Sequence, residues 1–355
     1  MLGTTLVSFT AIDTHLQIPR IQQASASVER QLGANMMIQF GYLGAWGRNL
    51  DRSRLVNNAL PGAGPVQPRR PNQTITFAPG TQLPADVPIA SLTFPVGPIN
   101  LLESTGRSQY NSGWVLAKRT FSRGLSFLAN YTYASSFTDA PSFRSPANEA
   151  EVPQNSFNPG AEWGPAGCDI RHRFVSSLIY KIPFAAAAPG GAGALARVAR
   201  GLLGDWQVSL IYQAQSGFPF TIGVFGDTAN AGALLNVNPI RASSVHGVSP
   251  DLPTSERNAD HWFNTAAFAT PPAFSFGDVG RNSVVGPGLS KADLALDRPR
   301  ALGAVNLHVR VEVFNVFNTV NYDTPNRFVN TPQFGTITEA ATPARQIQFV
   351  LRAVF

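Results

Sequence analysis

The chain has 355 residues, of which 44% are hydrophobic and only 14% are charged, and its formal net charge is +6. Its Lys and Arg residues are scattered and form no run of about five or more, which argues against nucleic acid as a partner. Because Cys168 is the single cysteine, the sequence excludes an intrachain disulfide and any metal site built on paired cysteines.

Segments in which apolar and polar residues alternate recur along the chain, and each predicts a β-strand with two different faces. The 31 Gly and 28 Pro residues support this prediction, because both residue types disfavour long helices. In chain order the predicted strands, about ten in all, cover residues 5–12, 21–32, 35–46, 110–120, 124–136, 171–182, 205–215, 290–298, 305–313 and 345–355.

The clearest of these strands is residues 305–313, VNLHVRVEV. Its odd positions are all aliphatic, and its even positions are all polar: Asn306, His308, Arg310 and Glu312. Successive side chains of a strand point to opposite faces, so one face of this strand is apolar throughout.

The links between the predicted strands alternate in length. The links 33–34, 121–123 and 299–303 are short, 183–204 is intermediate, and 47–109, 137–170, 216–289 and 317–344 are long. Long loops are therefore expected at one end of the sheet and short turns at the other. Outer-membrane barrels have this asymmetry, with short periplasmic turns and longer extracellular loops. The fold class predicted is all-β: a partial antiparallel transmembrane β-barrel with long extracellular loops.

Two membrane-related signals of other kinds are absent from the sequence. No stretch of about 18 apolar residues occurs, which excludes a transmembrane helix. The first residues, MLGTTLVSFTAID, lack the pattern of a secretory signal, so an export signal is expected upstream of residue 1.

The cost of charge in lipid predicts which face points where. An Arg on the lipid face at the bilayer midplane costs roughly 2–4 kcal/mol, so Asn306, His308, Arg310 and Glu312 are expected to face the lumen. Aromatic residues at strand ends favour a barrel over a soluble β-sandwich, since they would form a girdle at the membrane boundary; they are Trp46, Tyr133, Phe137, Trp206 and Tyr212.

Several segments resemble Oar-like TonB-dependent outer-membrane receptors. They are ESTGRSQYNSGWVLAKRTFSRGLSFLANYTYASSFTDA, CDIRHRFVSSLIYKIPF, LLGDWQVSLIYQAQSGFPFT, VRVEVFNVFNTVNYDTPN and FGTITEAATPARQIQFVLRAVF. The resemblance runs in order from about residue 21 to residue 355. It implies a Gram-negative bacterium and a barrel of about 22 strands around a plug. It also implies ligand binding by plug and loops, with energy supplied through a TonB box.

The same resemblance implies the partners. The terminal Phe355 resembles the signal read by the outer-membrane barrel assembly machinery, and outer-membrane lipid would accept the apolar faces. Residues 1–355 are expected to be the C-terminal part of such a barrel without a plug, so TonB would act only through a missing N-terminal region. Residues 5–12 and 345–355 are then expected to be edge strands.

Two alternatives differ in kind from a receptor. One is a small outer-membrane barrel that acts as a passive pore or adhesin. The other is a secreted soluble β-sandwich that binds carbohydrate.

No catalytic, cofactor or metal site is predicted, and the protein is not expected to be an enzyme. Asp169, Arg171 and Arg173 share one strand face and His172 the other, which spoils a compact acid–base set. His308 and Glu312 are roughly 13 Å apart along a strand, too far for one metal ion, and an ion-pair network through Arg310 is expected instead. Loop aromatics, among them Trp163, Trp262 and Phe263, are expected to pack on one another rather than on a sugar.

Overall fold

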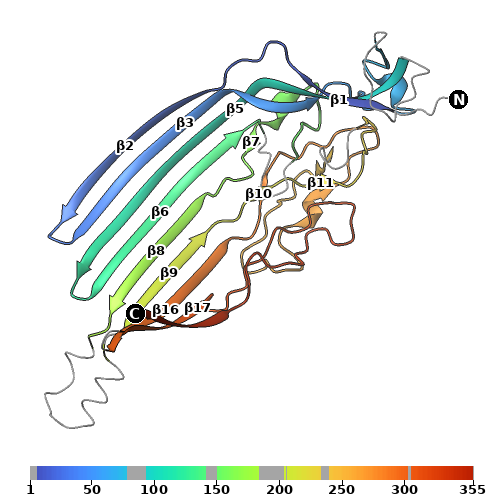
Figure 1. Cartoon of the computed structure of the whole chain (residues 1–355). Helices are drawn as coiled ribbons and strands as arrows, with labels where there is room; N and C mark the ends of the chain where they lie inside the picture. The colour runs from blue at the N-terminus through green and yellow to red at the C-terminus, as the bar shows by residue number, and fades with distance from the viewer. Residues whose placement is uncertain are drawn as a thin grey trace, which may run out of the picture.

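The structure, a computed structural model, describes residues 6–77, 93–140, 150–183, 204, 206–232, 240–302 and 305–354. Its main feature is one broad, curved sheet (Figure 1). In the described residues this sheet has 12 strands, ordered β18, β17, β16, β9, β8, β6, β5, β3 and β2 by hydrogen bonding, with β1, β4 and β7 beside this path. The strands are β1 (Val7–Ile12), β2 (Arg20–Leu32), β3 (Met36–Leu55), β4 (Thr74–Thr76), β5 (Thr93–Ser122), β6 (Leu125–Thr138), β7 (Gly164–Pro165), β8 (His172–Lys181), β9 (Gln207–Gln215), β16 (Leu289–Leu302), β17 (Val305–Phe314) and β18 (Gln346–Val354).

Every segment that the alternation predicts as a strand contains one, and the neighbours on the path are antiparallel. The turn between β5 and β6 shows how the local sequence produces a hairpin. Arg123 and Gly124 both have positive φ, 51° and 82°, and a two-residue turn of this kind matches the twist of the strands it joins. The links at 33–34 and 121–123 close tight hairpins, as predicted, whereas residues 299–302, expected in a short link, belong to β16.

Two strands are much longer than predicted. Residues 47–109 were expected to be a loop, but β3 continues to Leu55 and β5 starts at Thr93. The two strands continue beyond the main sheet as a paired ribbon, with register irregularities between Gly47 and Arg52. Asn49 has φ 55° at this irregularity, which is typical of a bulge. The loop prediction was wrong because the alternation is broken at the bulge, although backbone pairing continues beyond it.

The prediction that residues 5–12 form an edge of the sheet was also wrong. Strand β1 pairs in parallel with the ribbon part of β5, where Phe9 lies opposite Ile99. The edges are β2 and β18, which share no ladder in the described residues, so the sheet is open. Alternation predicts that a strand forms, but it does not specify which neighbour accepts its hydrogen bonds.

The two faces of the sheet differ as predicted. One face, here the apolar face, carries large exposed side chains such as Val28, Phe349 and Leu351, which are 71%, 79% and 71% exposed. The register places Val311 of β17 beside Leu296 and Phe349 on this face. The opposite face, here the polar face, carries the even positions of β17. An exposed apolar face of this size needs an apolar medium or a partner.

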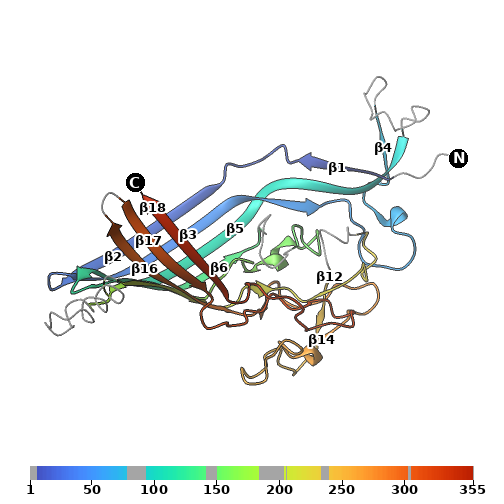
Figure 2. The same cartoon turned by 60° about the horizontal axis from the view of Figure 1, so that its bottom comes forward.

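All long links lie at one end of the sheet and fold onto one another (Figure 2). We call this body the loop assembly; its described residues are 56–77, 139–140, 150–171, 216–232, 240–288 and 315–345. Its core contains Phe220, Ile222, Val224, Phe263 and Phe268, and Phe334 packs against Phe263 at 5.3 Å between ring centroids. Three two-stranded sheets in the loop assembly pair β10 (Pro219–Phe220) with β15 (Val284–Val285), β11 (Gly223–Val224) with β12 (Ile240–Arg241), and β13 (Ser243–Ser244) with β14 (Phe268–Ala269).

Buried polar residues join the separate loops. Asn57 is fully buried and donates to the carbonyl oxygens of Asn72 and Gly97 at 2.9 and 2.8 Å. Gln154 donates to the carbonyl oxygen of Gly277 at 2.9 Å and accepts from the Arg241 N–H at 3.1 Å. Satisfied buried polar groups of this kind fix one arrangement of the chain, because breaking them leaves unpaired groups in the interior.

A buried ionic network attaches the ribbon to the loop assembly. Glu103 on β5 accepts from Arg52 at 2.9 Å and Arg54 at 2.7 Å on β3. Asp139, just after β6, lies 3.2 Å from Arg107 and 3.9 Å from Arg52. Burial raises the pKa of Glu103, but the hydrogen bonds from its two arginines and Thr105 outweigh burial and hold that pKa below its ordinary value.

No helix among the described residues combines the length and the apolar character needed to cross a membrane.

Replacing Phe220 with Ala will destabilise the loop assembly while the large sheet persists. Phe220 is fully buried, and truncating a buried Phe to Ala costs about 3–5 kcal/mol. Hydrogen exchange of amides in residues 216–288 measures the local opening free energy. Phe317→Ala is the control, since Phe317 is 74% exposed. Equal loss of protection in both variants would show that the loop core does not hold the assembly.

Glu103→Gln will weaken the attachment of the ribbon and flatten its pH dependence. A carboxylate with a lowered folded-state pKa stabilises the fold above its ordinary pKa of 4.5, and this stabilisation is lost as the pH falls through the folded-state pKa. Protection of residues 48–55 and 93–107, corrected for intrinsic exchange rates, measures it between pH 7 and pH 3. The exposed Glu256→Gln serves as control. An unchanged pH slope in Glu103→Gln contradicts this role.

Candidate functional site

The polar face of β17 holds the residues predicted to line a lumen. Arg310 and Glu312 form an ion pair with 2.7 Å between Nη2 and Oε1, which confirms the expected pairing through Arg310. His308 lies opposite Arg352 of β18 and Pro299 of β16. Asn306, at the end of the strand near the short turns, lies opposite Val354. The structure therefore brings two of the four predicted residues into contact and spaces the other two along the same face.

The polar face continues across the other strands. Arg310 lies opposite Asp297 of β16, and Asp297 lies opposite Gln207 of β9. Glu312 lies opposite Ala295, whose other neighbour is Ser209. Charged and neutral polar groups thus form rows across the sheet, the composition expected of a surface in contact with water.

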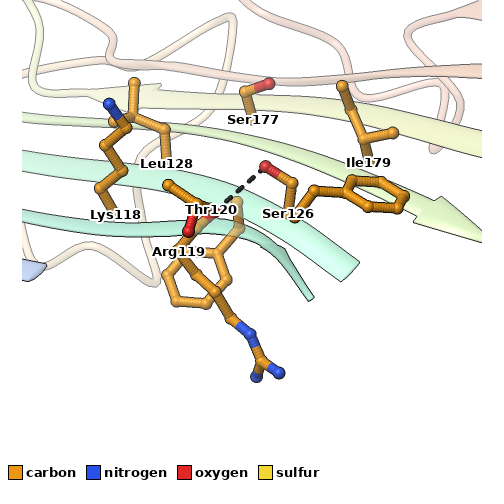
Figure 3. Close-up of a pocket in the computed structure, with 9 residues that line it drawn as sticks. Lys118, Arg119, Thr120, Ser126, Leu128, Ser177 and Ile179 are labelled. Carbon is orange, nitrogen blue, oxygen red and sulfur yellow. Dashed lines mark hydrogen bonds between the residues drawn. The ribbon is translucent and has the colours of Figure 1, made fainter. Parts of the chain in front are cut away.

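A hollow of about 460 Å³ lies near the short turns between β5, β6 and β8. Lys118, Leu128 and Ser177 lie opposite one another in its lining. Figure 3 shows these three side chains on the same side of the strands, whereas Arg119 extends to the other side. The Ser126 hydroxyl donates to the carbonyl oxygen of Arg119 at 3.1 Å. The hollow combines one cationic side chain with apolar walls.

A second hollow, of about 360 Å³, lies at the loop end of the polar face and is lined by Tyr110, Asp169 and Arg173 among others. Asp169 lies 3.0 Å from Arg171 and accepts from the Ser136 N–H at 2.7 Å. Burial raises the pKa of Asp169 above its ordinary value, more than these two contacts lower it. The charged side chains of Asp169, Arg171 and Arg173 therefore lie on the polar face, as predicted.

His172 lies on the apolar face, away from that charge group. Its Nδ1 is 2.8 Å from the Tyr131 hydroxyl, and its ring lies 5.2 Å from the Tyr133 ring. The prediction that His172 is separated from Asp169 and Arg173 is confirmed. No acid–base set forms between them.

A cleft of about 550 Å³ lies in the loop assembly where β9 ends and β16 begins. Trp262 and Tyr322 meet edge to face in its wall at 6.5 Å between ring centroids, and the Arg257 guanidinium lies 5.9 Å from the Trp262 ring. The indole N–H of Trp262 donates to the carbonyl oxygen of Val285 at 3.0 Å, which fixes the ring. Aromatic rings fixed in this way, beside a cation and backbone groups, can hold a small polar ligand with one flat face.

Sequence reasoning singled out Trp262 but missed its partners. Tyr322 is 60 residues away in sequence and comes from the loop between β17 and β18, so no local pattern joins the two. The ionic network of Glu103, Arg52 and Asp139 was also missed, since its members were assigned to two different loops. The loop aromatics do pack on one another, as the rings of Phe263 and Phe268 do at 5.7 Å.

Two further predictions concern metal binding and the assembly signal at the end of the chain. Among the described residues, no group of three or more His, Cys, Asp or Glu side chains is placed to hold a metal ion. Phe355, the predicted assembly signal, lies outside the described residues.

No curated protein matches the chain. Among solved structures, the outer membrane transporter YddB from Escherichia coli is similar over 95% of this chain, with 9% identity and a TM-score of 0.45. The FrpB iron transporter from Neisseria meningitidis (F3-3 variant) is similar over 96%, with 10% identity and a TM-score of 0.42. The chain spans only 32% of the length of each.

The family comparison covers almost the entire chain. The model described as "Outer membrane beta barrel domain" matches residues 3–348. That match agrees with the antiparallel sheet, its two unlike faces and its separation of turns from long loops. The chain belongs to the outer membrane β-barrel domain family, and its location is the cell outer membrane.

Proposed function

We propose that this chain forms part of the barrel wall of a TonB-dependent outer-membrane receptor that captures a ligand at the cell surface for uptake. The apolar face meets lipid, and the polar face with Asn306, His308, Arg310 and Glu312 lines the lumen. The observation that carries the proposal is the division of one open sheet into an exposed apolar face and a charged polar face, with a folded loop assembly at one end.

The open edges support a barrel larger than this sheet. Strands β2 and β18 share no ladder in the described residues. An unpaired backbone group in lipid costs several kcal/mol, so both edges require partner strands, which our proposal takes from the rest of a larger barrel. In our proposal these strands and a plug belong to the same receptor, TonB acts through its N-terminal region, and the assembly machinery recognises the end of the chain at Phe355.

The loop assembly supports surface capture of a ligand. Long loops of outer-membrane barrels are extracellular, so the cleft at Trp262 and Tyr322 faces the outside of the cell. A packed core around Phe220 holds the loops together and pre-organises the cleft, which lowers the entropic cost of binding. The proposal assigns no catalytic step to any residue.

A passive pore or adhesin is the second candidate. The rigid, packed loop assembly favours it, since an adhesin needs a stable surface rather than a transport cycle. The alternative of a secreted soluble β-sandwich is wrong. The family is an outer-membrane one, and within the described residues no second large sheet covers the apolar face.

Leu210→Arg and Ser209→Arg form a matched pair that tests the orientation of the sheet. Leu210 lies between Leu178 and Leu294 on the apolar face, whereas its neighbour Ser209 lies on the polar face. Leu210→Arg will lower the free energy of unfolding in phospholipid vesicles by about 2–4 kcal/mol, and Ser209→Arg will change it little. Urea titrations in vesicles measure both. Equal effects would overturn the assignment of the faces.

Recording of ion current in a planar bilayer separates the two candidate functions. The protein is purified in the full form that its gene encodes. A receptor whose lumen is filled by a plug carries no steady ion current, whereas a passive pore carries a constant one. Our proposal expects closed traces and binding of the purified periplasmic domain of TonB. A constant current without TonB binding would reject the receptor and favour the pore.

A further inference from the structure

Two arginines lie directly opposite each other where the apolar face meets the loop end. Arg20 at the start of β2 pairs with Arg48 of β3, and both side chains are exposed. Directly opposed side chains in an antiparallel pair have their Cβ atoms about 4.5–5.5 Å apart, and like charges at that distance destabilise the sheet. The pair therefore costs stability unless something offsets it.

The described part of the protein supplies no counter-charge to this pair. Neither arginine has a carboxylate within ion-pair distance there, in contrast to Arg52 and Arg54, which both contact Glu103. A third cation lies nearby, because Gly47, just before Arg48, lies opposite Ser108, just after Arg107. Arg107 is already paired with Asp139 and lies 5.1 Å from the Trp163 ring. The opposed pair is thus left for a ligand with negative charge.

The position of the pair indicates what that ligand is. Gln22 and Trp46 are the next pair on the same face toward the short turns, followed by Ala24 with Gly44 and Ala26 with Tyr42. The arginines thus lie beyond the ring of Trp46 at the boundary of the apolar face, on the side of the extracellular loops. In the outer membrane this boundary is the head-group level of the outer leaflet.

We propose that Arg20 and Arg48 together bind the phosphate group of an outer-leaflet lipid whose apolar part lies along the apolar face. A guanidinium presents a planar fork of N–H donors that matches phosphate oxygens, and two arginines lie directly opposite each other here. The phosphate offsets the repulsion between the arginines, and the acyl chains cover Trp46 and Tyr42. The site is separate from the lumen and from the loop cleft.

The test measures binding of fluorescent diphosphoryl lipid A to the detergent-purified protein. We expect Arg20→Gln/Arg48→Gln to weaken binding at least about tenfold, since it removes two charge-assisted contacts. Arg30→Gln is the matched control, because Arg30 lies on the same strand and the same face but at the other end. It should bind lipid A as the wild type does. Dephosphorylated lipid A should bind wild type and double variant alike.

The unfolding midpoint of Arg20→Gln, measured with and without lipid A, provides a second test. If the arginines had only a structural role, lipid A would not reverse the order of the midpoints of wild type and variant. Without lipid A, Arg20→Gln relieves the repulsion and raises the midpoint of unfolding; with saturating lipid A the order of wild type and variant reverses. Native electrophoretic mobility before and after heating verifies folding of each variant. Equal lipid A binding by the double variant and wild type, or an equal loss in Arg30→Gln, would overturn the proposal.

Discussion

The structure depends on one constraint: every backbone N–H and C=O in the sheet needs a partner, because lipid provides none. In the described residues the ladders from β2 to β18 satisfy this requirement strand by strand, and each of these two outer strands has one edge without a partner strand. In paired, extended strands, successive side chains point to opposite faces of the sheet. Because apolar and polar residues alternate in the sequence, they lie on opposite faces. An apolar wall and a polar interior therefore follow from one backbone arrangement.

The loop assembly satisfies the constraint differently. Its segments have little regular structure, so buried side chains take the place of ladders. Asn57 donates to backbone groups of its own link and of β5, and Gln154 donates to a distant loop. On the adjoining ribbon, Glu103 accepts from two arginines of the neighbouring strand. Polar contacts that are buried in this way are stronger than the same contacts in water. In the receptor that we propose, this combination holds the loops together for ligand capture.

The positions of the charged residues also depend on which face of the sheet they occupy. On the polar face, Arg310 and Glu312 form an ion pair within β17. At the outer boundary Arg20 and Arg48 lie opposed without a carboxylate in the described residues, and there the membrane itself can supply the anion. Under our proposals, the charges of one sheet meet three environments: lipid, lipid head groups and lumen.

The sequence by itself determined the strands, their two faces, the alternation of turns with loops and the pairing of Arg310 with Glu312, because these features depend on neighbours in sequence and a period of two. Only the tertiary structure decided the extension of β3 and β5, the parallel pairing of β1 with β5 and the meeting of Trp262 with Tyr322. These depend on contacts between residues far apart in the chain, and such contacts leave no periodic trace. The bulge near Asn49 concealed the ribbon for the same reason: it breaks the local pattern while the distant partner strand continues.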